Sequence, residues 1–399
     1  MTTLLPIDAR IANADRADEV VAPQYDTLGL SGRYRYAIDH PDCFLNVVLS
    51  RADFPAVEIE GLDIARRAAE HFEGMVDRGL FPAHGQPSFF LYELASDTHR
   101  QVGLVAGVPV HAITDGHVLG HEGTIHDRAL DLAEFYRTAR LTSSPVALAF
   151  NAADEQRALF DRITEGAPIR DFSGSDGVRQ LLWSIDDPGD IAAVQESMEG
   201  VESYYITDGH HRVAAAQIEG AVPGWFLGVI FPSEQMRVLE YNRCVALNAE
   251  PSVDAISNAL GSDWQIQRLG DTGLVDARPA LVGDFSMLIE DVWYRLRFVG
   301  DRPDDPVQRL DVCLLHDRVL APAFGITDDQ DGRLSYVVGE DAGPRLERAV
   351  RYGEHIVAFA LHPTSLEELF DVADAKRRMP AKSTWFTPKP RSGLIVVRW

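Results

Sequence analysis

One short segment gathers side chains suited to binding an anion. Residues 206–214 read Ile-Thr-Asp-Gly-His-His-Arg-Val-Ala, so an apolar strand enters a polar turn and the turn leads into a helix. Backbone N–H groups at a helix start favour an anion, and Gly209 permits close approach of the backbone. Asp208 could hold magnesium or orient a hydroxyl. Further hydrogen-bond donors of the kind that phosphate needs come from His210, His211 and Arg212. The alternative is a polar turn with a satisfied histidine pair.

A second candidate lies before a predicted helix that starts at Asp127. Residues 120–124 read Gly-His-Glu-Gly-Thr. A zinc motif of the His-Glu-x-x-His type would need histidine at position 125, where Ile125 stands, so that motif is excluded. Glu122 could act as a general base on a hydroxyl. In the alternative interpretation, Glu122 and Thr124 only cap the helix. The neighbouring candidates are His121, Thr124 and Arg128.

The third candidate is the polar segment 379–389, Met-Pro-Ala-Lys-Ser-Thr-Trp-Phe-Thr-Pro-Lys. The glycines that precede Lys-Ser-Thr in a phosphate-binding P-loop are missing, so a P-loop is excluded. A lysine of this tail could still reach a phosphate; otherwise the segment only ties down the C-terminus. Its candidate residues are Lys382, Ser383, Thr384 and Lys389.

A fourth, weaker candidate is the pair Tyr25 and Asp26, which follows Pro23. Such a pair after proline is usually a turn. No Gly-x-Gly-x-x-Gly, Gly-x-Ser-x-Gly or EF-hand pattern occurs in the chain.

Alternating helices and strands must position these residues. A strand at 204–206 and a helix at 213–219 flank the turn at 208–212, and a helix at 127–140 follows Glu122. Further strands are predicted at 88–94, 146–150, 181–185 and 225–231, and helices at 64–74 and 186–198. Residues 101–113 are predicted to form one or two strands with a break near Val105–Pro109, and 165–178 a loop. Residues 1–55 are rich in loops.

Composition narrows the classes of function. The chain has 399 residues and a formal net charge of −24, so general binding to nucleic acid is disfavoured. The three cysteines form no Cys-x-x-Cys pair, and their apolar surroundings predict buried thiols. No apolar stretch of membrane-spanning length and no signal peptide is apparent, so we expect a cytoplasmic protein.

Taken in chain order, the motifs resemble those of one protein family. Segments 23–26, 42–48, 121–128, 183–188, 208–212 and 379–389 look like the family called domain of unknown function 1015, over nearly the whole chain. Asp-Gly-His-His-Arg and Met-Pro-Ala-Lys-Ser-Thr-Trp-Phe-Thr-Pro-Lys are its most specific parts. The chain departs from the family at Gln24, where a second proline is usual, and at Val213, where an aromatic residue is usual.

That family in turn resembles the ParB/sulfiredoxin-like superfamily, in which a strand–turn–helix unit binds nucleotide phosphates. The free serine kinases share the Asp-Gly-His-His-Arg turn itself. The resemblance implies an α+β protein with a ParB/sulfiredoxin-like α/β core over 105–248. An N-terminal α+β segment, 1–104, and a C-terminal α+β segment, 249–399, would extend it, with the tail returning to the cleft.

The resemblance also implies roles for the candidates. Glu122, Asp208 and His210 become the catalytic residues, with Glu122 as the base that deprotonates a hydroxyl and Asp208 as the residue that holds Mg²⁺ or orients that hydroxyl. Phosphates of ATP or ADP would be bound by Gly209, His211, Arg212, Lys382, Ser383 and Thr384.

The expected function is a magnesium-dependent, kinase-like phosphotransferase that acts on the hydroxyl of a small metabolite such as free serine. The alternatives are a ParB-like nucleotide-binding switch or NTP hydrolase without a small-molecule acceptor, and a non-catalytic interaction protein that retains an anion site. The oligomeric state stays open. If Glu122 and Asp208 serve one site, much of 145–180 must be an insertion.

Overall fold

The fold is that of a computed structural model, which describes residues 2–25, 28–55, 63–248, 251–270, 273–353 and 356–399. Its contacts gather into two compact units. The first consists of Met1–Gly120, Thr124–Met236 and Pro388–Trp399, and the second of His121–Gly123 and Arg237–Thr387. The N-terminal segment and the expected core thus share one unit, because one hydrophobic cluster joins them. The expected division into 1–104, 105–248 and 249–399 stays a prediction.

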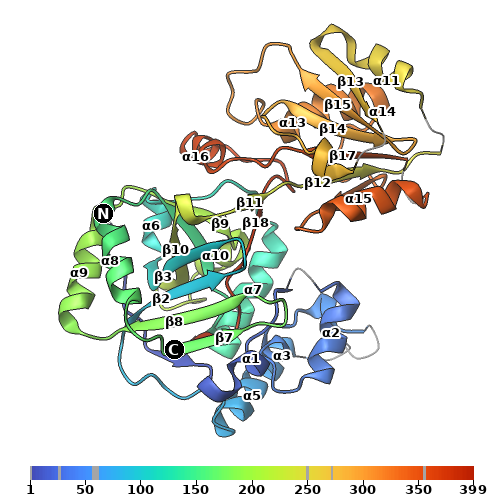
Figure 1. The fold of residues 1–399 in the computed structure, drawn as a ribbon. Coiled ribbons are helices and arrows are strands. Elements are labelled where there is room, and N and C mark those ends of the chain that lie inside the picture. The colour runs from blue at the N-terminus through green and yellow to red at the C-terminus, as the bar shows by residue number, and fades with distance from the viewer. Residues whose placement is uncertain (1, 26–27, 56–62, 249–250, 271–272, 354–355) are drawn as a thin grey trace. The chain divides into compact units, whose positions relative to one another are not determined.

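An eight-stranded sheet forms the centre of the first unit (Figure 1). Its strands are, in spatial order, β4 (Val118–Leu119), β9 (Tyr204–Asp208), β6 (Val146–Phe150), β10 (Trp225–Pro232), β3 (Arg100–Pro109), β2 (Phe89–Ala95), β8 (Arg179–Ile185) and β7 (Arg170–Ser173). Strand β4 runs parallel to β9 and β6 parallel to β10, whereas the other neighbours are antiparallel. The sheet is therefore mixed.

Both faces of this sheet are buried, because successive side chains of β2 point to opposite faces and pack into two different hydrophobic clusters. Phe90, Tyr92 and Leu94 belong to one hydrophobic cluster, and Phe89 and Leu91 to another. The first cluster includes side chains of the N-terminal helices, and the second includes side chains of three later helices (α8, α9 and α10). A sheet covered on both faces holds its strands in one register, which makes it a rigid support for the residues at its strand ends.

The helices of the first unit are α1 (Ala17–Val20), α2 (Leu30–Asp39), α3 (Leu45–Val48), α5 (Ile64–Asp77), α6 (His111–Thr114), α7 (His126–Ala139), α8 (Asp154–Thr164), α9 (Pro188–Glu199) and α10 (His210–Ala216). Short 3₁₀ turns are η1 (Ala14–Arg16), η3 (Arg51–Asp53) and η4 (Ser233–Gln235). Asp187 caps α9, where its side chain accepts from the N–H groups of Gly189 and Asp190.

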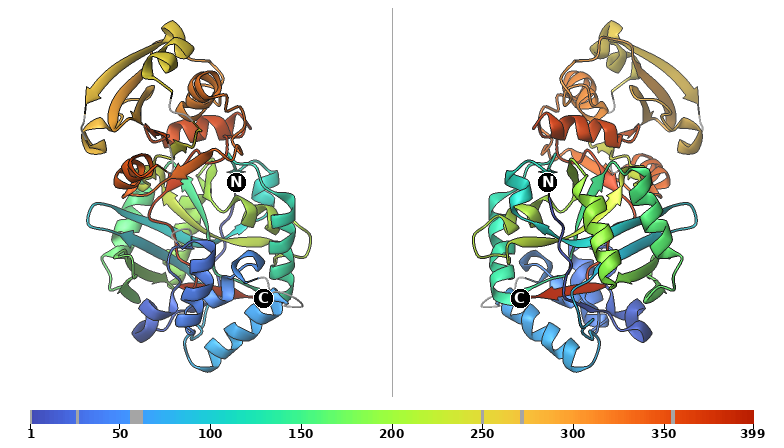
Figure 2. Two further views of the ribbon diagram at one scale, coloured as in Figure 1. Left: turned by 90° about the vertical axis from the view of Figure 1, so that its right-hand side faces the viewer. Right: turned by 90° about the vertical axis from the view of Figure 1, so that its left-hand side faces the viewer.

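The C-terminal strand β19 (Ile395–Arg398) is built into the first unit. It is the middle strand of a three-stranded sheet, between β1 (Ala9–Ile11) and β5 (Leu141–Thr142). Figure 2 shows it in red among the blue and cyan elements of this unit. The last residues of the chain are therefore part of the core that supports the eight-stranded sheet.

The second unit has a six-stranded sheet in the order β13 (Trp264–Gly270), β15 (Val292–Phe298), β14 (Asp284–Ile289), β17 (Val357–Leu361), β12 (Asn242–Val245) and β16 (Leu334–Val337). A two-stranded sheet pairs β11 (Val238–Leu239) with β18 (Trp385–Phe386). Its helices are α11 (Val253–Leu260), α12 (Leu274–Ala277), α13 (Asp311–Leu315), α14 (Ala321–Phe324), α15 (Ala342–Arg351) and α16 (Leu366–Asp374), with a 3₁₀ turn η5 (Gly261–Asp263) and a π-helical turn η6 (His316–Leu320).

Most of the predicted elements are present, and the differences have physical reasons. The predicted break near 105–109 is wrong, because β3 is continuous and a Cβ at Gly107 would lie 3.0 Å from the Trp225 ring. Glycine there permits close packing rather than a break. The predicted loop 165–178 contains β7, a short edge strand of alternating exposure. The N-terminal 55 residues include α1, α2 and α3, which were not predicted.

All three cysteines are free and buried, as predicted. Burial raises the pKa of Cys43 to about 11 and those of Cys244 and Cys313 to about 12. Over the described residues, no helix is both long enough and apolar enough to cross a membrane.

Candidate functional site

The Asp-Gly-His-His-Arg turn follows β9 directly. The register between β6 and β9 shifts at Ala147, so that Asp208 pairs with Ala147 and Ile206 with Leu148. The Thr207 hydroxyl donates to the Ala147 carbonyl at 3.1 Å. Such a bulge re-aims the side chains at the end of a strand. It delivers Asp208 to the turn with its carboxylate 30% exposed.

The turn itself depends on Gly209. Its φ of +106° lies in the region that favours glycine. A Cβ at this position would lie 2.9 Å from Nε of Arg212. Helix α10 then begins at His210, three residues before the predicted start.

Asp208 joins two cationic side chains. Its Oδ2 accepts from the Arg212 guanidinium, and its Oδ1 accepts from Nζ of Lys389 at 3.1 Å. Arg212 also donates to the carbonyl oxygen of Pro145. The side chains of Arg212 and Lys389 are 21% and 14% exposed. The structure thus brings together a residue of the turn and a residue of the C-terminal tail.

These neighbours set the protonation states in the turn. Burial alone would raise the pKa of the Asp208 carboxyl, but Lys389 and Arg212 outweigh it and lower that pKa to about 2. Burial lowers the pKa of His210 to about 4, although Asp208 acts in the opposite direction. Asp208 is therefore ionised and His210 neutral at pH 7, and the three charged groups sum to one positive charge.

His211 connects the turn with the start of α7. Its Nε2 accepts a hydrogen bond from the backbone N–H of Ile125 at 3.0 Å. The pKa of His211 is lowered by burial and by the charges of Arg128 and Arg212. A neutral ring that accepts at Nε2 carries its proton on Nδ1. His211 can therefore donate to a ligand only through Nδ1.

The tail that carries Lys389 is fixed by several bonds. The Gln101 side-chain amide donates to the Pro388 carbonyl at 3.2 Å, and the hydroxyls of Ser144 and Ser392 are 2.6 Å apart. Buried Arg391 pairs with Asp176. Proline on both sides of Lys389 restricts its backbone. Lys389 therefore reaches Asp208 from a constrained main chain.

His121 and Glu122 belong to the second unit, where His121 contacts Met379 of the polar tail segment. His121 is buried, and its carbonyl oxygen accepts from the backbone N–H of Met379 at 2.7 Å. Oε1 of Glu122 lies 3.9 Å from Nε2 of His121. Helix α7 has Ile125 at its N-cap and no side-chain capping bond. Ile125 is therefore the N-cap residue of α7, and a capping role of Glu122 or Thr124 stays a prediction.

The Lys-Ser-Thr segment forms a tight turn within the second unit. Lys382 has a φ of +62°, and its carbonyl accepts from buried Arg243 at 3.1 Å. Nζ of Lys382 lies 5.6 Å from the Tyr241 ring centre. The buried Ser383 hydroxyl donates to the Pro380 carbonyl at 2.7 Å, and Thr384 is buried next to it. The hydroxyl of Ser383 is thus engaged in closing its own turn.

Tyr25 lies in a separate cluster. Its hydroxyl donates to Asp53 at 2.6 Å, and the Arg33 guanidinium lies 3.7 Å from its ring centre. Burial and then the bond to Asp53 raise the pKa of Tyr25 to about 12. Asp26 lies outside the described residues. The contacts of Tyr25 are those of a structural side chain in the N-terminal segment.

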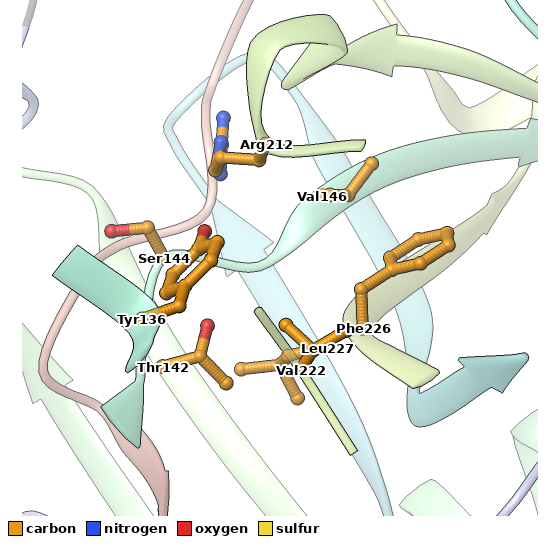
Figure 3. Close-up of a pocket in the computed structure, with 8 residues that line it drawn as sticks. All are labelled: Tyr136, Thr142, Ser144, Val146, Arg212, Val222, Phe226 and Leu227. Carbon is orange, nitrogen blue, oxygen red and sulfur yellow. The ribbon is translucent and has the colours of Figure 1, made fainter. Parts of the chain in front are cut away.

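A small cavity adjoins Arg212 (Figure 3). Arg212 lies at one end of it, and apolar side chains lie at the other. It has room for about one water molecule, which is too small for a nucleoside or a sugar. The lining residues are Tyr136, Thr142, Ser144, Val146, Arg212, Val222, Phe226 and Leu227. At this size the cavity is not a substrate pocket.

The donor set at the turn is a poor match to a bound magnesium ion. Each carboxylate oxygen of Asp208 already accepts from a cation. Among the described residues, no group of three or more His, Cys, Asp or Glu side chains could hold a metal ion. A protein-held Mg²⁺ usually takes one or two carboxylates and the substrate phosphates. The role of Asp208 as a magnesium ligand stays a prediction. A magnesium ion would have to compete with Lys389 and Arg212 for the Asp208 carboxylate.

Two participants at the turn were missed from the sequence. Both are backbone groups, the carbonyl of Pro145 and the N–H of Ile125. Every residue carries such groups, so no pattern of residue types could have found them.

The chain belongs to the family described as "Protein of unknown function (DUF1015)", whose model matches residues 4–313. The resemblance seen in the sequence is thereby confirmed. The tail residues 379–389, Lys389 included, lie beyond the matched range. No curated protein matches the chain.

Several solved structures are distantly similar. SbnI with a C-terminal truncation from Staphylococcus aureus is 13% identical, with a TM-score of 0.40, and the match covers 73% of this chain and 85% of that one. A free serine kinase in complex with AMP is 14% identical, with a TM-score of 0.35 and coverage of 73% and 91%. A variant free serine kinase in complex with ADP is 12% identical, with a TM-score of 0.36 and the same coverage. The likeness concerns a mixed α/β fold with several sheets.

Proposed function

We propose that this protein is a phosphotransferase that moves a phosphoryl group from a nucleotide to the hydroxyl of a small metabolite such as free serine. ATP or ADP is the proposed donor, accompanied by Mg²⁺. In this proposal the phosphates of the nucleotide are bound by Gly209, His211 and Arg212 of the turn, together with a lysine from the tail segment.

One observation carries the proposal: Arg212 and Lys389 meet at Asp208, directly after a bulged strand end. Both cations are largely buried, so water screens them weakly. The neighbouring histidines are neutral at pH 7, which leaves one net positive charge in the cluster. Phosphoryl transfer depends mostly on positioning and on neutralising phosphate charge. A preorganised cationic cluster supplies both.

Glu122 is the proposed base. A carboxylate can take the proton of an attacking hydroxyl when it lies within hydrogen-bond reach. Its position in the chain supports the role, because Ile125, whose N–H binds His211, follows only three residues later. His210 is proposed to help orient the reacting groups as a neutral side chain.

The first experiment measures nucleotide binding by isothermal titration calorimetry with ATP, ADP, CTP and GTP, each with and without Mg²⁺. Arg212→Lys should weaken binding about tenfold or more, because a bidentate guanidinium contact to phosphate is lost. The matched control is Arg137→Lys on α7, where the guanidinium donates to the carbonyl of Glu219. Its binding should equal that of the wild type.

The second experiment follows phosphorus NMR spectra of nucleotide incubated with serine and other small hydroxyl compounds. Glu122→Gln should abolish transfer and leave nucleotide affinity unchanged, whereas Glu165→Gln, an exposed control, should change neither. Nucleotide hydrolysis without a phosphorylated acceptor would instead favour a ParB-like hydrolase or switch. Indifference to all four nucleotides would refute the proposal and favour a non-catalytic interaction protein.

A further inference from the structure

The carboxylate of Asp208 has one cation on each oxygen. Lys389 occupies Oδ1 at 3.1 Å and Arg212 occupies Oδ2. A metal ligand offers its oxygens to the metal, whereas a carboxylate between two cations holds those cations together. The Asp208 side chain is 30% exposed, and both partners are less exposed than it is.

The two candidate lysines of the tail differ in what they contact. Lys389 pairs with Asp208 at the turn, within the first unit. Lys382 lies in the turn closed by Ser383, within the second unit, with Nζ over the Tyr241 ring. Of these two lysines, Lys389 is therefore the one with an ion pair to the cluster that would bind phosphate.

We propose that Asp208 is a positioning residue that holds Lys389 and Arg212 side by side as a clamp for the phosphates of the nucleotide, and that it is not a magnesium ligand. Lys389 is the tail lysine that contacts phosphate. This inference rests on the proposed function, because it specifies which groups hold the nucleotide.

Elementary electrostatics supports this arrangement. Two like charges held close together repel each other, and a carboxylate between them offsets that repulsion. The main chain of Lys389 is constrained by Pro388 and Pro390 and by the bond from Gln101. A ligand that meets a preorganised pair loses less conformational entropy on binding. The clamp thus combines residues of the turn with a residue of the C-terminal segment Pro388–Trp399, which belongs to the same unit.

The first test compares Lys389→Met with Lys382→Met, the same change at the two tail lysines. ADP affinity is measured by calorimetry in EDTA, so that no metal contributes. We expect Lys389→Met to weaken binding at least tenfold and Lys382→Met to leave it within twofold. Lys389→Arg, which keeps the charge, should restore most of the affinity. Melting temperatures of all three variants report whether each one is folded.

The second test asks whether Asp208 holds a metal. The ratio of ADP affinities with Mg²⁺ and with EDTA is measured for the wild type and for Asp208→Asn. A positioning residue leaves this ratio unchanged, whatever happens to each affinity. A collapse of the ratio towards one in Asp208→Asn would show a metal ligand and overturn the inference.

The outcomes separate the two proposals. If the wild type binds ADP and Lys389→Met binds it equally well, the clamp is refuted and the proposed function stands. Loss of affinity in Lys382→Met alone would refute it as well. If the wild type binds no nucleotide, the proposed function fails and the clamp fails with it.

Discussion

The backbone N–H of Ile125 donates to Nε2 of His211 at 3.0 Å, and this bond ties the turn after β9 to the first turn of α7. The bond requires the His211 ring to be unprotonated at Nε2. His211 is thus a candidate ligand of phosphate and also accepts a hydrogen bond that supports the fold.

Removing this acceptor should cost stability. His211→Ala leaves the Ile125 N–H without its partner, and we expect the free energy of unfolding to fall by about 1 kcal/mol. His211→Gln, whose side-chain oxygen can accept, should recover part of that loss. Urea unfolding monitored by circular dichroism measures both. His126→Ala, at an exposed position at the start of α7, is the control and should change little. Equal stabilities of His211→Ala and the wild type would contradict the structural role.

The lowered pKa of His210 predicts how stability depends on pH. Its pKa is about 4 in the folded protein, against an ordinary value of 6.5. Between these values the unfolded chain binds a proton that the folded chain does not, so stability falls as the pH is lowered through this window. The shift corresponds to a loss of the order of 3 kcal/mol. The lowered pKa of His211 acts in the same direction, whereas that of Asp208 takes effect only below about pH 4.

Urea unfolding at pH 7, 6 and 5 checks this prediction. His210→Gln should flatten the pH dependence, and His111→Gln, at an exposed position, should leave it as it is in the wild type. The histidine NMR resonances of the wild type, followed as a function of pH, measure the pKa of His210 directly and need no variant. A His210 resonance that titrates near pH 6.5 would contradict the buried, neutral ring.

Gly209 should tolerate no side chain. Gly209→Ala places a Cβ at a φ of +106° and 2.9 Å from the Arg212 guanidinium. The backbone cost is about 1 kcal/mol or more, and Arg212 must also move from its place beside Asp208. Gly116→Ala is a matched control, since Gly116 has a φ of +77° and nothing within 4 Å of its added Cβ. Both variants should be less stable than the wild type, but only Gly209→Ala should lose nucleotide binding.

The sequence predicted the elements around the site better than the contacts within it. Helix α7 has one buried face, and strands β6, β9 and β10 are mostly apolar runs that are buried along nearly their whole length. The turn 208–212 was found from its dense polar residues. By contrast, β7 is a short strand of alternating exposure, and its composition resembles that of a loop.

The pairing of strands far apart in the chain determines which residue of the segment 379–389 contacts the turn, and local sequence patterns do not show this pairing. Residues 379–389 offer two lysines and two hydroxyls of similar chemistry, and local patterns do not distinguish them. The distinction comes from β19, which pairs with β1 and so draws Pro388–Trp399 into the first unit. Asp208 and Lys389 are distant in the chain, and this pairing, together with the bonds from Gln101 and Ser144 to the tail, brings them together.

The tail hydroxyls provide a last prediction. The Ser383 side chain is buried, and its hydroxyl donates to the Pro380 carbonyl at 2.7 Å, while its own carbonyl accepts from the Thr364 hydroxyl at 3.2 Å. Ser383→Ala removes the first bond and leaves the Pro380 carbonyl short of a donor. We expect the free energy of unfolding to fall by about 1 kcal/mol. Nucleotide affinity should stay unchanged, because this hydroxyl is engaged within its own turn.

Ser257→Ala, at an exposed site on α11, controls for loss of a serine hydroxyl as such. Calorimetry with ADP and urea unfolding, run on the same preparations, separate the two effects. Weaker ADP binding at unchanged stability would instead return Ser383 to the phosphate-binding residues suggested by the family resemblance.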